Sequence, residues 1–336
     1  MSHRVCVEEL AGGYEPAIRK AFQTVGALST LKPGARVFIK PNLTFPVYRP
    51  GVMTNPECVE ALVRVLKDHT THITIGEADS GGYNRFSMDE VLARTGIKGL
   101  ERKYGIRVVN LCHLPARTIR FDCRGRGMDL PLPQLLLDET DLVISTAVPK
   151  IHMNTLVSMT VKNLWGCIPE PPVRLRLHPY LGRVLFEIVR QLKQAIGVVD
   201  GQYGLNRSGP MLGVPVNLGW LMVADDLYAA DVAGCQLMQV DPRRVRHLSD
   251  TGHADYRMPS LGDIEFNRDL RPFLKEQFYL KRKWTDLPGG WAFRSPALSY
   301  LAYFSPLSGF LHRILYLFRK PFYNYNDPGK TEDDHG

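Results

Sequence analysis

Short runs of aliphatic and β-branched residues recur along most of the chain, and each run ends in a polar or glycine-containing turn. The runs that predict β-strands lie at 36–39, 72–75, 141–145, 195–199 and 221–224. Apolar residues at helical spacing predict helices at 56–68, 87–95, 181–192 and 228–238. Ser87 and Glu90 have the spacing of a capping box, which marks the start of the second helix.

The repeated order of strand, turn and helix predicts an α/β fold with a mostly parallel sheet and helices on both faces. Two further strand candidates, 107–109 and 118–122, are expected at an edge of the sheet. Connections between parallel strands are right-handed, so the turns that follow the strands should lie along one rim. Open α/β sheets bind their ligands at that rim. Polar residues in these turns are therefore the functional candidates.

The composition changes after about residue 270. We expect an α/β domain over 1–270, an aromatic and basic extension over 271–326, and a disordered tail over 327–336. The stretch 298–311 carries no charge, but it is too short to span a bilayer, and Pro306 and Gly309 interrupt it. Residues 284–326 could form an interfacial helix hairpin on an anionic membrane. The alternative is an element that packs on the domain or on a second subunit.

The formal net charge of +8 favours anionic partners. A small anionic molecule or an anionic membrane surface accounts for this charge, whereas nucleic acid is disfavoured because no nucleic-acid-binding signature accompanies it. The six cysteines form no CxxC pair, so buried thiols in a reducing compartment are expected. The first residues contain no apolar signal segment. These features predict a cytoplasmic protein, with peripheral membrane attachment as the alternative.

Two turns at predicted strand ends carry charged residues. Lys40 ends a buried strand, which is costly unless it meets a counter-charge or an anionic ligand, and Asn42 follows it. Glu77 and Asp79 precede the turn formed by Ser80, Gly81 and Gly82. The carboxylates could hold a divalent cation or act as acid and base, and the glycine turn could bind an anion. The alternatives are a lysine that extends to solvent and a plain surface turn.

The stretch 148–166 is the densest group of candidates. We expect a helix from Thr155 onward, with Ser158 and Lys162 on the same face as Thr155. Lys150 and His152 lie in the turn before this helix, and Asn163 follows Lys162. Lysines, a histidine and amide groups together predict anion binding and proton transfer.

Other carboxylates follow later strands. Asp200 precedes a glycine-rich stretch that is either a mobile lid or a surface connection. Asp225 is expected at the same rim, with helix capping as the competing explanation. We therefore predict Glu77, Asp79, Asp200 and Asp225 as ligands of a divalent metal. His178 is a weaker candidate, because a lone histidine is more often structural.

Several separated motifs then suggest a family. These are Lys-Pro-Asn-Leu at 40–43, Thr-Asn-Pro-Glu at 54–57, Gly-Glu-Ala-Asp-Ser-Gly-Gly at 76–82, Pro-Lys-Ile-His at 149–152, Val-Lys-Asn-Leu-Trp-Gly at 161–166, Asp-Gly at 200–201 and Gly-Pro at 209–210. In this order they resemble the Domain of Unknown Function 362 family over roughly 36–240. The family is largely uncharacterised, and some members are fused to iron–sulfur modules. This chain has no CxxCxxC run, so an iron–sulfur cluster in this chain alone is not expected.

Three functions follow from these observations. The first is an enzyme that binds a phosphate- or carboxylate-bearing small molecule at the rim. In it Lys150, His152, Lys162 and Asp79 are catalytic, and the substrate-binding residues are Lys40, Asn42, Ser80, Gly81, Gly82, Thr155 and Asn163. The second is a redox partner of a separate iron–sulfur or flavin protein. The third is a membrane-associated adaptor. We favour the enzyme, because an adaptor would have no use for the charged rim residues.

Overall fold

The computed structural model describes residues 2–29, 31–80, 86–282 and 286–318. Its strands are β1 (His3–Glu9), β2 (Val37–Pro41), β3 (Ile73–Glu77), β4 (Arg107–Asn110), β5 (Ala116–Cys123), β6 (Arg126–Pro133), β7 (Leu142–Ala147), β8 (Lys150–His152), β9 (Leu156–Ser158), β10 (Ala195–Asn206), β11 (Val214–Ala224) and β12 (Ile264–Phe266). Its α-helices are α1 (Tyr14–Val25), α2 (Pro56–Lys67), α3 (Met88–Arg94), α4 (Leu100–Tyr104), α5 (Gln134–Asp138), α6 (Thr160–Asn163), α7 (Pro171–Leu177), α8 (Leu181–Gln191), α9 (Leu227–Leu237), α10 (Arg246–Ser249), α11 (Leu287–Ala292), α12 (Pro296–Tyr303) and α13 (Ser308–Phe318).

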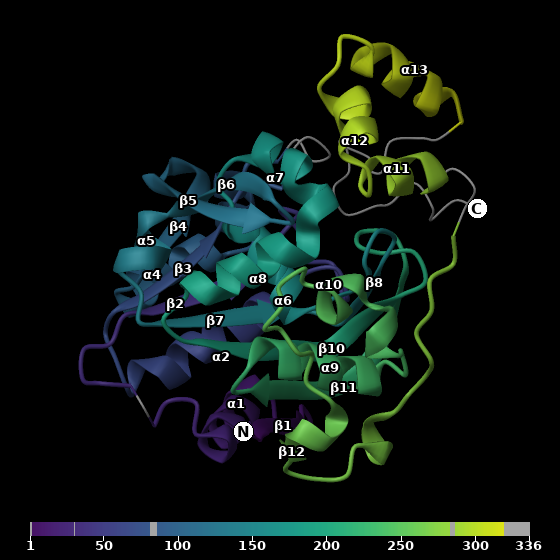
Figure 1. Ribbon diagram of the computed structural model, residues 1–336. Coiled ribbons are helices and arrows are strands. Elements are labelled where there is room, and N and C mark those ends of the chain that lie inside the picture. The colour runs from purple at the N-terminus through teal and green to yellow at the C-terminus, as the bar shows by residue number, and fades with distance from the viewer. Residues whose placement is uncertain (1, 30, 81–85, 283–285, 319–336) are drawn as a thin grey trace.

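The main sheet has the strand order β12–β1–β11–β10–β7–β2–β3–β4 (Figure 1). Neighbours along this path are parallel, except that β11 runs antiparallel to both β1 and β10. The predicted α/β fold with a mostly parallel sheet is confirmed. The strand predicted at 107–109 is β4, at the edge of this sheet. The one predicted at 118–122 is instead β5, which pairs with β6 in a separate two-stranded sheet.

The two faces of the sheet support two hydrophobic cores. Along β2, Val37 and Ile39 point into one core, which contains the buried side chains of α1 and α2. Phe38 points into the other core, with α8 and α9. Successive strand residues point to opposite faces, and here both faces are covered by helices. Burial on both sides explains why such strands are continuous apolar runs in the sequence.

The predicted helices at 56–68, 87–95, 181–192 and 228–238 are confirmed as α2, α3, α8 and α9. Their starts follow from side-chain caps in three cases. Asn55 accepts the N–H of Glu57 at 3.0 Å, and Ser87 accepts the N–H of Glu90 at 3.2 Å. Asp226 accepts the N–H of Ala229 at 2.8 Å. Each cap satisfies a backbone donor that the first turn of a helix leaves without a partner.

The glycine-rich stretch after Asp200 belongs to a long β-ribbon. β10 continues beyond the end of β7 to Asn206, and the chain returns as β11. A Cβ atom at Gly201 would lie 2.2 Å from the ring of Trp220 on the paired strand, so only glycine fits there. The residues from Gly201 to Asn206 are thus part of a paired and largely buried strand, and the prediction of either a lid or a surface connection is wrong for them.

The C-terminal helices α11, α12 and α13 lie beside one end of the sheet, near α7 (Figure 1). Among the described residues, no helix is long and apolar enough to cross a membrane. The tail predicted at 327–336 lies outside the described residues, and the domain boundary at residue 270 stays a prediction. All six cysteines are free, and five of them are buried.

Candidate functional site

Lys40 ends β2 with no exposed surface, and it has the counter-charge that its burial requires. Its Nζ donates to the Glu77 carboxylate and to the carbonyl oxygen of Pro41 at 2.9 Å. Glu77 ends β3, the parallel neighbour of β2, so the register of the sheet brings the two side chains together. Burial raises the pKa of the Glu77 carboxyl, while the Lys40 charge opposes this rise.

Lys150 lies on β8 and is also buried. Its Nζ donates to Asn42 Oδ1 at 2.5 Å and to the carbonyl oxygen of Val52 at 2.7 Å. Burial, together with the positive charge of Lys162, lowers the pKa of Lys150 to about 7. Lys40, Asn42, Glu77 and Lys150 are thus gathered at one rim of the sheet, as the sequence predicted.

The segment that follows Lys150 differs from its prediction. Thr155 and Ser158 belong to the hairpin β8–β9 and not to a helix. Helix α6 begins only at Thr160, where the buried Asp231 accepts the N–H groups of Thr160 at 2.7 Å and Val161 at 3.2 Å. The prediction that Thr155, Ser158 and Lys162 share one helix face is therefore wrong, although Lys162 does lie on α6.

Lys162 has an electrostatic environment that favours an anion. Its side chain is half-buried, and within the described part of the chain no side chain or carbonyl oxygen accepts a hydrogen bond from it. Burial lowers the pKa of Lys162 to about 8. Burial and the Lys162 charge lower the pKa of His178 and of His247 to about 3, and that of His152 well below its ordinary value. The three imidazoles are therefore neutral near pH 7.

These histidines differ in their hydrogen bonds. His152 Nδ1 accepts the N–H of Asn154 at 3.1 Å, so the proton of the neutral ring is on Nε2. His178 packs against Phe293 with ring centroids 4.2 Å apart. Both ring nitrogens of His247 are buried and lack a hydrogen-bond partner among the described residues. An imidazole left in this state is costly and has its full hydrogen-bonding capacity available to a ligand.

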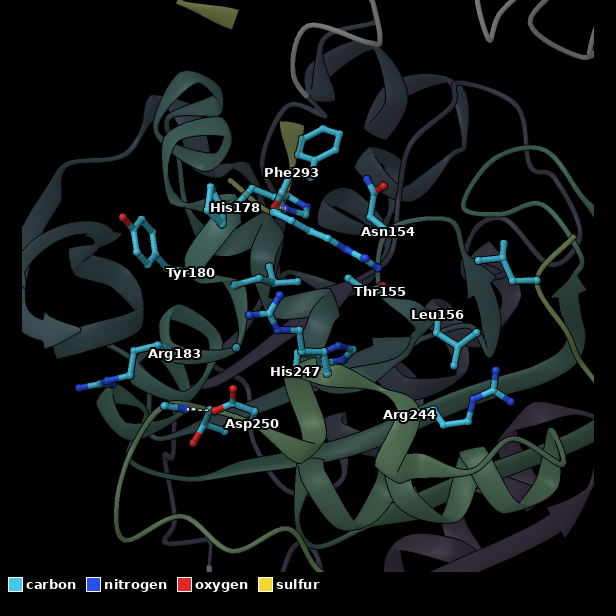
Figure 2. A pocket seen from close by; sticks show the side chains of 18 of the residues that line it. Asn154, Thr155, Leu156, His178, Tyr180, Arg183, Arg244, His247, Asp250 and Phe293 are labelled. Carbon is cyan, nitrogen blue, oxygen red and sulfur yellow. Dashed lines mark hydrogen bonds between the residues drawn. The ribbon is translucent and has the colours of Figure 1, made fainter. Parts of the chain in front are cut away.

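His178 and His247 line a cavity of about 790 Å³. Figure 2 shows Asn154, Thr155, His178 and His247 around the same space. Six arginines also line it: Arg124, Arg183, Arg244, Arg246, Arg282 and Arg294. Arg124 pairs with Asp250 and Arg183 with Glu187, whereas the other four have no ion pair in the described structure. The cavity therefore carries an excess of positive charge.

The four predicted metal ligands are not brought together. Asp79 accepts the N–H of Met88 at 2.7 Å, and Asp200 accepts Tyr14 Oη–H and the N–H of Asn55, both at 2.8 Å. Asp225 lies at the opposite rim of the sheet, near the start of β10, because β11 is antiparallel to β10. Among the described residues, no three His, Cys, Asp or Glu side chains are grouped to hold a metal ion.

The remaining predicted residues have separate positions. Asn163 Nδ2 donates to the carbonyl oxygen of Lys40 at 2.9 Å and to Ser145 Oγ at 3.1 Å, so it joins α6 to the strand ends. Ser80 is half-exposed. Gly81 and Gly82 lie outside the described residues.

Sequence reasoning missed two contributions. Arg174 on α7 is buried, and its guanidinium donates to the backbone carbonyl oxygen of Asp79. His247 and two of the cavity arginines come from the run Arg-Arg-Val-Arg-His at 243–247. The density of basic residues in that run was the available signal. Nothing near Arg174 in the sequence indicates that it reaches the strand ends.

The rim motifs coincide with a family match. The model of the family described as a domain of unknown function (DUF362) matches residues 37–236. The chain belongs to the DUF362 family. This DUF362 chain is 27% identical over 246 residues to a thylakoid-associated protein of Synechocystis sp., which covers 70% of this chain and 73% of that protein.

Two solved structures are similar to the DUF362 chain at a lower level. A Thermotoga maritima protein has a TM-score of 0.41 at 14% identity, covering 69% of this chain and 61% of its own. The lactate racemase apoprotein of Thermoanaerobacterium thermosaccharolyticum has a TM-score of 0.43 at 16% identity, covering 70% of this chain and 56% of its own. The chain thus spans less than two thirds of either solved protein.

Proposed function

We propose that this DUF362 protein is an enzyme that binds a small phosphate- or carboxylate-bearing molecule in the cavity lined by His178 and His247. The observation that carries the proposal is a half-buried ammonium with no hydrogen-bond partner in the described structure, whose charge acts on His178 and His247, two residues that line an arginine-rich cavity. An anion that reached both residues would accept hydrogen bonds from the Lys162 ammonium and from the single N–H of the neutral His247 ring. Charge-assisted hydrogen bonds of this kind are stronger than neutral ones.

The site residues then have distinct roles. Lys162, with its pKa at about 8, binds the anion while charged and accepts a proton when neutral. His152 and His247 act as neutral donors or acceptors. Lys150 holds Asn42, and Lys40 holds Glu77, so these two pairs fix the rim that supports α6. Asp79 orders the start of α3 through the N–H of Met88.

The test is isothermal titration calorimetry with inorganic pyrophosphate and with succinate. We expect Lys162→Met to weaken binding of the anion that binds best by about ten- to hundredfold, because one charged hydrogen bond is lost. Lys32→Met is the matched control, since Lys32 is an exposed lysine that precedes β2, at the rim opposite Lys40. It should bind as the unchanged protein does. Equal affinity in the two variants, or no binding of either anion, would refute the proposed site.

A further inference from the structure

Exposed apolar side chains are concentrated in the C-terminal helices. The described residues include thirteen exposed large hydrophobic side chains, and nine of them lie between residues 287 and 317. These nine are Leu287, Trp291, Leu298, Tyr300, Leu301, Leu307, Phe310, Ile314 and Leu317. The surface of a monomeric protein usually shows such residues scattered singly, so nine of them within one segment indicate a surface that binds something apolar.

On α13 the exposed residues form one stripe. Phe310, Ile314 and Leu317 are spaced as one face of a helix, with exposed fractions of 62%, 40% and 78%. Arg313 is also exposed and directly precedes Ile314. This face is therefore amphipathic, with a basic residue beside the apolar stripe.

The helices are attached to the body through other residues. Ser299 on α12 is buried and its Oγ donates to the carbonyl oxygen of Leu175 on α7 at 3.3 Å. The ring of Phe293 lies between His178 and Tyr303, with centroid distances of 4.2 Å and 5.5 Å. One side of α11–α13 is thus held on the domain, and the apolar stripe is displayed away from these contacts.

The charge of this part of the sequence selects the partner. Between residues 281 and 326 there are seven basic residues and one acidic residue. They are Lys281, Arg282, Lys283, Arg294, Arg313, Arg319 and Lys320, against Asp286. Exposed aromatic and aliphatic residues among Lys and Arg are typical of helices that lie in an anionic membrane interface. Two copies of this segment would both carry an excess of positive charge, which disfavours self-association.

We propose that α11–α13 are a docking surface for an anionic lipid bilayer, with Trp291, Phe310, Ile314 and Leu317 inserted at the level of the head groups. The longest of these helices, α13, has 11 residues, so the segment lies in the interface and does not span the bilayer. Phe293, Arg294 and Pro296 of the same segment also line the cavity. Docking therefore places the cavity beside the membrane surface. This inference does not depend on which anion the cavity binds.

The experiment is flotation of the full chain with vesicles. One set of vesicles is phosphatidylcholine alone, and the other is an equimolar mixture of phosphatidylcholine and phosphatidylglycerol. The test variant is Phe310→Ser/Ile314→Ser/Leu317→Ser. The matched control is Val47→Ser/Val214→Ser/Leu261→Ser, three residues that are 41% exposed on the rest of the molecule.

We expect the unchanged chain and the control to bind the anionic vesicles, and to bind less as salt is added. The test variant should bind at least about tenfold more weakly, because three apolar side chains no longer leave water. Undiminished binding by the test variant, or equal binding to both vesicle types, would overturn the proposal. Loss of a dimer in the test variant, with no vesicle binding by the unchanged chain, would show that a second copy covers the surface. Titration of the test variant with pyrophosphate distinguishes the two proposals, because anion binding in the cavity should be unchanged when only membrane binding is lost.

Discussion

At the scale of single residues, Lys40 and Glu77 form a buried ion pair at the rim, with side chains that are 0% and 5% exposed. Removing two charges from water costs several kcal/mol for each ion. The attraction between them offsets this cost, together with the hydrogen bonds from Lys40 to the Pro41 carbonyl oxygen and from the Ala78 N–H to Glu77. The pair therefore adds little net stability, yet neither partner tolerates the loss of the other. Such a pair fixes the relative positions of the β2 and β3 ends.

Glu77→Gln should lower the free energy of unfolding by about 3–5 kcal/mol, because it leaves the Lys40 ammonium buried without its counter-charge. Lys40→Met/Glu77→Leu should lose much less, since both charges are removed. Urea unfolding followed by circular dichroism measures the two effects. Asp129→Asn breaks an exposed ion pair with Arg120 and serves as the control, with an expected change below about 1 kcal/mol. A Glu77→Gln variant as stable as this control would contradict the argument.

The sequence allowed the partner of Lys40 to be expected but not identified. A lysine at the end of an apolar strand requires a counter-charge for a local, energetic reason. Which carboxylate provides it depends on the parallel register of β2 and β3. Arg174 could not be predicted in this way, because the packing of α7 alone brings it to the loop after β3.

At the scale of elements, α6 depends on a residue from another helix. Asp231 on α9 accepts three hydrogen bonds, from Thr160 Oγ1 at 2.6 Å and from the N–H groups of Thr160 and Val161. An isolated turn of helix is unstable, because nucleation fixes several residues for a single hydrogen bond. Asp231 therefore determines where α6, the helix that carries Lys162, begins.

Asp231→Ala should destabilise the protein by about 2–4 kcal/mol, because two backbone donors and one hydroxyl lose their acceptor in a buried place. Asp226→Ala, which removes a cap with a single hydrogen bond on α9, should cost only about 1 kcal/mol. The comparison is made by urea unfolding of both variants. Pyrophosphate affinity should also fall in Asp231→Ala and stay unchanged in Asp226→Ala. Equal stability losses would mean that Asp231 acts as an ordinary cap.

The same contact explains why the helix expected from Thr155 was wrong. The residues 155–162 are compatible with a helix when considered alone. The cap that delays the helix to Thr160 lies 71 residues away, and β8 pairs with both β9 and β10. Long-range pairing therefore overrode the local pattern. By contrast, α2 and α3 were predicted closely because their caps, Asn55 and Ser87, are adjacent in sequence.

At the scale of the whole molecule, one strand direction decides which carboxylates can meet. A sheet with all strands parallel would have placed Asp225 at the rim with Glu77 and Asp200. Because β11 is antiparallel, Asp225 lies at the opposite rim, where it accepts the N–H of Arg4 at 2.9 Å. The apolar run 221–224 contains no sign of its direction. The rim was therefore predictable where strands follow helices, and not where a hairpin reverses the chain.

The buried basic residues also set how the stability of the whole molecule depends on pH. His152, His178 and His247 have pKa values far below the ordinary 6.5 in the folded protein, chiefly through burial. Between pH 6.5 and about 3 the unfolded chain binds protons at these residues that the folded chain does not. The free energy of unfolding is therefore highest, as far as these three residues are concerned, above pH 6.5, and it decreases as the pH falls through this range.

His247→Leu removes one of these three protonation sites. The substitution also changes stability by an amount that does not depend on pH. Apart from this, the free energy of unfolding of the variant should rise relative to that of the unchanged protein, by up to about 1.4 kcal/mol for each unit of pH decrease below 6.5. Urea unfolding at several pH values from neutral to acidic measures this difference in slope. His69→Leu is the control, because His69 is exposed to water in the folded protein, and its curve should run parallel to that of the unchanged chain. A parallel curve for His247→Leu would mean that His247 takes up its proton in the folded state, and hence that neither its burial nor the Lys162 charge keeps the ring neutral.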